Sequence, residues 1–130
     1  MHDFHWPALI TLLVLVLLFV AGAKVGAARG KYGIQAPAVA GNPDFERIFR
    51  VQMNTNESAL MFLPALWLFA AFVSSPWSAG IGAVWVVARV WYAAAYAREA
   101  NKRGPAFGLS AAVTVVLMLG AAWGVAKSFM

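Results

Sequence analysis

Four long apolar segments alternate with more polar connections along the sequence. A transmembrane helix needs about 20 mainly apolar residues, and the pattern predicts four such helices, over about residues 6–28, 43–73, 77–98 and 106–126. Little of the chain is left for a soluble domain, so we expect one transmembrane domain over residues 1–130. Short connections make neighbouring helices antiparallel. The predicted fold class is therefore an all-α integral membrane protein, a four-transmembrane-helix up-down bundle.

The first apolar segment has a second interpretation, as a cleaved signal peptide. Residues 21–23, Ala-Gly-Ala, resemble a cleavage site. However, no lysine or arginine precedes the apolar run, and the run is long for a signal peptide. We therefore expect a retained helix.

The second segment begins with the residues of a helix start. Asn42 can cap the helix, and Pro43 suits its first position. Asp44 and Glu46 follow, where the positive end of the helix dipole favours carboxylates.

Composition supports the membrane interpretation. Hydrophobic residues make up 62% of the chain and charged residues 12%, whereas about 25% of a soluble domain is charged. The net charge of +5 does not indicate a nucleic-acid partner, because the basic residues gather near the ends of the predicted helices. The chain has no cysteine, which excludes disulfides, thiolate metal sites and a cysteine nucleophile. His2 and His5 lie near the N-terminus, where we expect solvated side chains and no metal site.

The basic residues also predict the orientation in the membrane. Positive charges are enriched in cytoplasmic loops. Only Lys127 clearly falls at the end opposite to the first and third loops. We therefore expect those two loops to be cytoplasmic. The basic residues on their side are Lys24, Arg29, Lys31, Arg47, Arg50, Arg98, Lys102 and Arg103.

Polar side chains form a row on each of two predicted helices. In the second helix, Arg47, Arg50, Asn54 and Glu57 are spaced by three, four and three residues, so they share one face. Lipid cannot solvate such a face, which must turn towards the bundle interior or a wet cleft.

The third helix has a matching row. Arg89, Tyr92 and Tyr96 are spaced by three and four residues, and Arg103 follows seven residues later. Together the two rows suit a small zwitterionic ligand with several carboxylates, because arginines bind carboxylates and a carboxylate can bind an ammonium. The alternative is that Arg89 and Glu57 neutralise each other, and the two interpretations are compatible.

Glycines recur at every fourth position in two predicted helices, as Gly22, Gly26 and Gly30 and as Gly120 and Gly124. Small residues at this spacing let helices approach closely in lipid. The spacing does not distinguish packing within one subunit from packing between subunits.

Two segments carry a distinctive pattern of charged, amide and aromatic residues. Residues 45–57 contain an acid–arginine pair, a second arginine three residues on, and then Gln, Asn and Glu. Residues 88–92, Ala-Arg-Val-Trp-Tyr, are followed by Tyr-Ala-Arg at 96–98 and Arg-Gly-Pro at 103–105. Both segments resemble the MAPEG family, the membrane-associated proteins in eicosanoid and glutathione metabolism. Residues 62–67, Phe-Leu-Pro-Ala-Leu-Trp, are similar to bacterial members that resemble microsomal glutathione transferases, which implies a location in a bacterial inner membrane.

The resemblance implies a homotrimer that binds glutathione between adjacent subunits near the cytoplasmic side. It implies that Arg103 activates the thiol and that Arg29 and Gln52 reach a neighbour's site. Because Gln52 is two positions, or about 200 degrees, from Arg50 on a helix, one helix can face two clefts. The implied contacts of one subunit are Arg50, Asn54, Glu57, Tyr92 and Tyr96.

The chain also departs from the family's eicosanoid enzyme, with Ser58 in place of a tyrosine and Leu60 in place of a proline. The similarity to bacterial members disfavours a leukotriene substrate. The expected activity is a detoxifying glutathione transferase, with glutathione as co-substrate and hydrophobic electrophiles as partners. Glutathione-dependent peroxidase activity is a further option. The alternatives are a non-catalytic lipid-binding member and a small multidrug transporter. Such transporters rely on a carboxylate deep in their first helix, whereas the only charged residue within residues 8–28 is Lys24.

Overall fold

The computed structural model describes residues 2–130 and confirms the predicted fold class. Within these residues it contains helices and no strand. Each of its four long helices is apolar enough and long enough to cross a membrane. They are α1 (His5–Tyr32), α2 (Pro43–Phe72), α3 (Ser75–Arg98) and α4 (Gly104–Ser128), and short 3-10 helices η1 (His2–Phe4) and η2 (Ala100–Arg103) precede α1 and α4.

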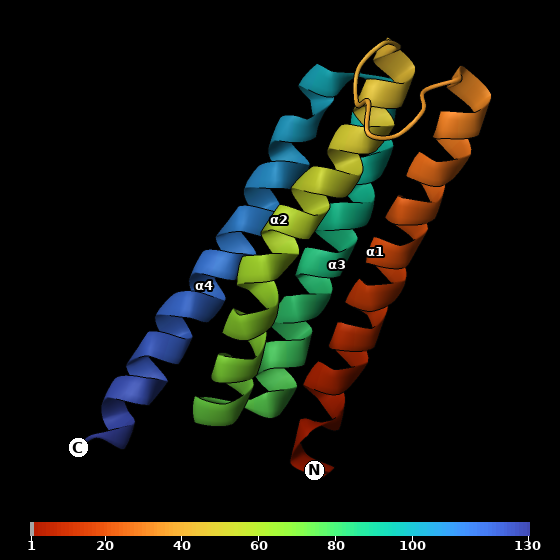
Figure 1. Ribbon diagram of the computed structural model, residues 1–130. Helices are drawn as coiled ribbons and strands as arrows, with labels where there is room; N and C mark the ends of the chain where they lie inside the picture. Colours follow the sequence, from red (N-terminus) through yellow and green to blue (C-terminus); the bar gives the residue numbers. More distant parts are fainter. Residues whose placement is uncertain (1) are drawn as a thin grey trace.

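The helices form an antiparallel bundle with α2 and α3 in the middle. Helix α1 packs against α2 and α3 on one side, and α4 packs against the same two helices on the other. The α1–α2 connection and η2 lie at one end of the bundle, and both termini lie at the opposite end (Figure 1). This topology brings the polar rows of α2 and α3 to the end that carries η2.

Four helix boundaries differ from the sequence prediction by two or more residues, namely the end of α1, the start of α3 and both ends of α4. Helix α1 continues to Tyr32 instead of ending near residue 28, because the glycine that caps its C-terminus is Gly33 and not an earlier one. Gly33 has a φ of 68°, a left-handed conformation that glycine adopts without steric cost, and its N–H group bonds to the Arg29 carbonyl. Helix α4 begins at Gly104, two residues before the predicted start at 106.

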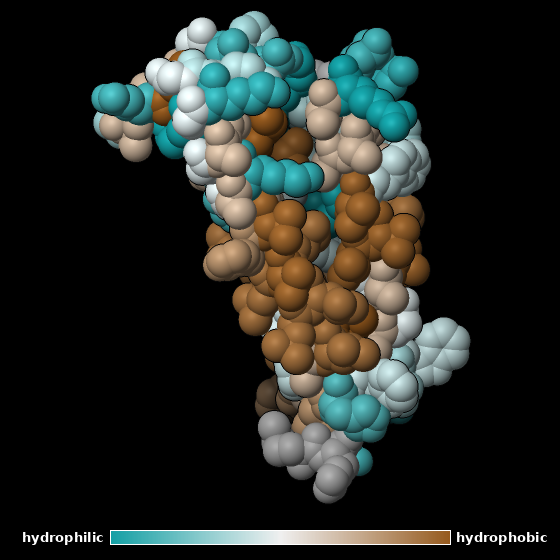
Figure 2. Space-filling model, turned by 90° about the vertical axis from the view of Figure 1, so that its right-hand side faces the viewer, coloured by the Kyte–Doolittle hydropathy of each residue, from teal (hydrophilic) through white to brown (hydrophobic). Residues whose placement is uncertain are grey.

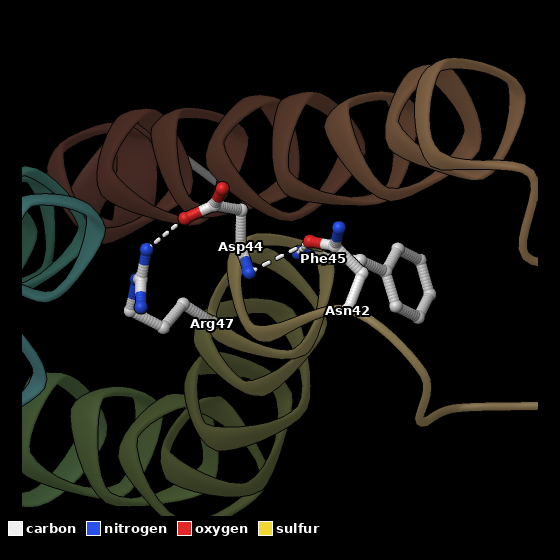
Figure 3. A network of polar contacts seen from close by, with 4 residues as sticks. All are labelled: Asn42, Asp44, Phe45 and Arg47. Atoms are coloured by element: carbon white, nitrogen blue, oxygen red, sulfur yellow. Dashed lines mark hydrogen bonds and ion pairs between the residues drawn. The ribbon is translucent and has the colours of Figure 1, made fainter.

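The start of α2 has the predicted cap. The Asn42 side-chain oxygen accepts hydrogen bonds from the backbone N–H groups of Asp44 and Phe45, at 2.9 and 3.1 Å. Arg47 pairs with Asp44 one turn further on (Figure 3). The two Asn42 hydrogen bonds satisfy backbone N–H groups that have no partner inside the helix.

A broad hydrophobic band covers the middle of the face of the bundle shown in Figure 2, between hydrophilic surfaces towards its two ends. Helix α1 contributes strongly exposed side chains such as Phe19, which is 80% exposed, and Leu12. Apolar side chains of this size are stable at the surface when lipid or another subunit covers them. The band therefore agrees with an integral membrane protein.

The core between α2 and α3 centres on two stacked rings. Phe62 and Trp85 are both fully buried, with ring centroids 4.2 Å apart and an interplanar angle of 5°. The Trp85 indole N–H donates to the Ser58 hydroxyl at 3.3 Å. Polar groups next to this core are thus held by direct hydrogen bonds.

The glycines fall into two groups. A Cβ atom at Gly120 would lie 2.4 Å from the Phe69 ring, and one at Gly124 would lie 2.7 Å from the Phe72 carbonyl oxygen. These two glycines therefore serve packing of α4 against α2 within one chain. Cβ atoms at Gly26 and Gly30 would meet nothing within 4 Å in the chain.

Candidate functional site

A polar cleft of about 550 Å³ opens at the η2 end of the bundle, between α2, α3 and the start of α4. Four of the predicted glutathione-binding residues and the predicted thiol-activating arginine line it together. They come from three separate elements that only the folded bundle brings together. The lining residues are Arg50, Asn54, Tyr92, Tyr96, Asn101, Arg103, Gly104 and Phe107.

Two arginines give the cleft its positive charge. Arg50 lies 3.8 Å from Glu57, and both side chains are about half exposed, at 52% and 54%. An exposed pair of this kind is weak, so either partner can exchange it for a ligand group. The Arg103 guanidinium lies 5.1 Å from the centroid of the Tyr96 ring. The cleft therefore offers cations to carboxylates, with one carboxylate nearby for an ammonium.

The alternative in which Arg89 and Glu57 neutralise each other is wrong, because Glu57 faces Arg50 instead. Arg89 is fully buried and hydrogen-bonds to neutral side chains of α2 and α4. Its guanidinium lies 4.0 Å from the Tyr92 ring centroid. Arg89 thus lies behind the cleft wall and not in the cleft.

An apolar pocket continues from the polar cleft between α2 and α4. Its volume is about 250 Å³, and it shares Asn54 and Phe107 with the cleft. It contains Glu57 and Ser58 at one end and shares Met61 and Met118 with a larger, almost wholly apolar groove of about 700 Å³. One continuous surface therefore leads from a hydrophobic face of the bundle to the polar cleft.

Arg29 and Gln52 lie outside this cleft, Arg29 on α1 itself and Gln52 on the side of α2 next to α1. Arg29 donates to the carbonyl oxygens of Ala38 at 2.7 Å and Ile34 at 3.3 Å, and so holds the α1–α2 connection. The Gln52 amide approaches Gly22, where a Cβ atom would lie 3.2 Å from its nitrogen. Neither residue can reach the cleft of its own chain from these positions.

Sequence analysis missed three residues that line the cleft, namely Asn101, Gly104 and Phe107. Phe107 follows Arg103 by four residues, and residues at this spacing lie on the same face of a helix. A helix predicted to begin at Gly104 would therefore have placed Phe107 on the same side as Arg103. Asn101 lies in η2, a segment that the sequence predicted as a basic turn, and no pattern marked it.

The described residues contain no group of three or more His, Asp or Glu side chains that could hold a metal ion. The side chain of His2 lies outside the described part of the structure.

Comparison with known proteins identifies the family. The model of the MAPEG family matches residues 7–123. The chain belongs to the MAPEG family. This match covers both segments that carried the resemblance and confirms it.

Three MAPEG relatives show how much of the chain is shared. The chain is 47% identical over 116 residues to an uncharacterised protein of Synechocystis, with 89% of this chain and 85% of the relative covered. It is 38% identical over 107 residues to microsomal glutathione S-transferase 2 of Bos taurus, with 82% and 73% covered. It is 34% identical over 123 residues to leukotriene C4 synthase of Bos taurus, with 95% and 82% covered. These relatives support a family of glutathione-related membrane enzymes.

Proposed function

We propose that this protein is a membrane-bound glutathione transferase that joins the thiolate of glutathione to hydrophobic electrophiles. The observation that carries the proposal is the junction at Asn54 and Phe107, where a cationic cleft meets an apolar pocket. A reaction between a charged peptide thiol and a lipophilic partner needs such a junction. The names of the glutathione S-transferase relatives support the choice of thiol.

The cleft suits glutathione chemically. Its volume of about 550 Å³ lies within the usual range for small-molecule sites. Arg50 is proposed to bind a carboxylate and Glu57 the ammonium group. Asn54, Tyr92 and Tyr96 supply hydrogen-bonding groups along the α2 and α3 walls.

Arg103 is proposed to activate the thiol. A thiol attacks as its thiolate, and its ordinary pKa of about 8.5 leaves only a few per cent ionised at pH 7. A guanidinium near the sulfur favours the charged form, and the thiol proton leaves to solvent because an arginine cannot accept it. The sulfur lone pair then forms a bond to the electrophilic carbon. The bond between that carbon and its leaving group breaks, and its electrons go to the leaving group, or to the ring oxygen where the electrophile is a strained cyclic ether.

The electrophile is proposed to arrive through the apolar groove between α2 and α4. A lipophilic molecule dissolved in the bilayer can enter this groove laterally and reach the junction past Met61 and Met118. Methionine side chains adapt to differently shaped partners, which suits a transferase of broad specificity. The same route would suit a lipid hydroperoxide, and peroxidase activity is therefore included in the proposal.

The active assembly is proposed to be a homotrimer with sites between subunits. Arg29 lies on α1 and Gln52 lies against α1, away from the cleft of their own chain, so their proposed role is towards a neighbouring subunit. Mixing Arg50→Ala subunits with Gln52→Ala subunits should then restore a fraction of the sites. A monodisperse monomer that binds glutathione as tightly as the assembled protein would disprove this arrangement.

Glutathione binding to the purified protein, measured by calorimetry, tests the proposed function, followed by conjugation assays with several electrophiles and a lipid hydroperoxide. We expect saturable binding and turnover with hydrophobic electrophiles. Lipid binding without any glutathione binding would instead support the non-catalytic alternative, which the large apolar groove favours.

A further inference from the structure

Arg89 is a buried cation without a buried counter-ion. Its side chain is fully enclosed near the middle of α3, and the described residues include no carboxylate paired with it. Its Nε atom has no hydrogen-bond acceptor among them. A charge in such a place is expensive and is usually paired or functional. The arrangement therefore requires an explanation beyond packing.

Neutral oxygens on α2 and α4 surround the Arg89 guanidinium. Nη2 donates to Asn54 Oδ1 at 2.8 Å and to Thr55 Oγ1 at 2.9 Å, and Nη1 donates to Ser110 Oγ at 3.2 Å. The Tyr92 ring covers one side of the group, 4.0 Å from its centre. Arg89 thus links three helices directly behind the wall of the cleft.

The chemistry of arginine determines which way the Asn54 amide points. A guanidinium has only donors, so the amide must turn its oxygen towards Arg89 and its NH₂ group away. Asn54 lines both the polar cleft and the apolar pocket. The amide therefore presents donors, and no acceptor, to the junction between them.

The other two acceptors do not pass the effect of Arg89 to the ligand. The Ser110 hydroxyl accepts from Arg89 and donates to the Phe107 carbonyl at 2.9 Å, so its proton is already used. Thr55 is almost fully buried and does not line the cleft or the apolar pocket. Among the described residues, Asn54 is the one hydrogen-bond acceptor of Arg89 that lines the cleft.

We propose that Arg89 is a positioning residue that acts through Asn54: it holds the amide with its NH₂ group directed at an acceptor or anionic atom of the ligand where the cleft meets the apolar pocket. The inference rests on the proposed function, because the ligand with such an atom is glutathione. Conjugation requires the glutathione sulfur to meet the electrophile at this junction. A fixed donor there, with a buried positive charge behind it, favours the thiolate without any rearrangement during the reaction.

Asn54→Asp separates the positioning role from a structural one. The carboxylate retains the contact with Arg89 and gives it an ion pair, but it removes the NH₂ donors. We expect the melting temperature of the detergent-purified protein to rise, while glutathione affinity measured by calorimetry falls about tenfold or more. If the contact between Arg89 and Asn54 had only a structural role, Asn54→Asp would not raise the melting temperature and lower the glutathione affinity together.

Thr55→Val is the matched control, since it removes an Arg89 acceptor of the same kind away from the cleft. It should lower the melting temperature and leave glutathione affinity close to the wild-type value. If Arg89→Met folds, it should weaken glutathione binding in the wild-type background. It should weaken binding little further in an Asn54→Ala background, because each change removes the same oriented donor.

Wild-type affinity in Asn54→Asp, or an equal loss of affinity in Thr55→Val, would overturn this inference and leave the proposed function intact. A wild-type protein that does not bind glutathione would overturn the proposed function and this inference with it.

Discussion

The interface between α2 and α4 is built differently at its two ends. Near η2, Arg89 ties Asn54 and Ser110 together with directional hydrogen bonds, and a polar cleft lies in front of them. At the opposite end, Gly120 and Gly124 let Phe69 and the backbone of Phe72 approach α4 closely. Hydrogen bonds orient particular donors, whereas close packing depends on volume. We therefore expect substitutions of the residues that line the cleft to change binding or chemistry, and substitutions at the glycine end to change stability.

The largest effect on turnover at pH 7 should come from Arg103→Ala. A shift of two units in the pKa of the bound thiol corresponds to about 2.7 kcal/mol. Losing that shift should reduce the thiolate fraction and turnover at pH 7 by roughly 20-fold. Turnover should recover in part as the pH rises, because the bound thiol then ionises without help. Steady-state rates across a pH series measure this, and glutathione should still bind.

Lys102→Ala is the control for Arg103→Ala. Lys102 lies in the same short helix and pairs with Glu99 at 3.4 Å on the exposed surface, so its removal should change turnover little. An unaltered rate and pH profile in Arg103→Ala would assign the activation of the thiol to another group.

The second effect concerns Glu57 at the edge of the cleft. Glu57→Gln keeps the shape of the side chain and removes the charge proposed to bind the glutathione ammonium. A hydrogen bond to a charged group contributes about 1.5–3 kcal/mol, so affinity should fall by roughly ten- to a hundredfold. Calorimetric titration measures the loss, and Glu99→Gln, a carboxylate outside the cleft, is the matched control. Equal affinities in the two variants would remove Glu57 from the site.

At the glycine end, Gly124→Ala should act on stability alone. The new Cβ atom would lie 2.7 Å from the Phe72 carbonyl oxygen, and overpacking of this kind typically costs about 1–3 kcal/mol. Thermal unfolding should occur at a lower temperature, while the glutathione affinity of the folded protein stays unchanged.

Gly26→Ala is the comparison for Gly124→Ala, because its Cβ atom would meet nothing within 4 Å in the chain. Alanine is favoured over glycine inside a helix by about 0.5–1 kcal/mol, so stability should stay the same or rise. Dissociation of the assembled protein in Gly26→Ala would instead show that this glycine packs between subunits.

The smallest effect concerns orientation, where no loss of function is expected. We propose that the η2 end, with its basic residues, faces the cytoplasm. Single cysteines at Pro76 and Lys102 can be introduced because the chain has no cysteine of its own. An impermeant thiol reagent added to intact cells should label only Pro76→Cys. Labelling of Lys102→Cys alone would invert the orientation.

Much of the molecule could be predicted before its structure was seen. Segment length and hydropathy were enough for the four helices, because each property is local to its segment. The spacing of Arg50, Asn54, Tyr92 and Tyr96 placed these residues on shared helix faces, and the structure brings them to one cleft. Their roles towards glutathione stay predictions.

Other features depended on how far each helix is rotated and shifted against its neighbours, which no local pattern specifies. The sequence by itself determined a membrane bundle with polar faces on α2 and α3, since burial of charge in lipid constrains those faces. Only the tertiary structure decided that Arg89 bonds to Asn54 and not to Glu57, and that Arg29 and Gln52 face away from the cleft. The reason is that hydrogen-bond partners are chosen by distances of a few ångströms between helices, whereas sequence periodicity reports only the face of a single helix.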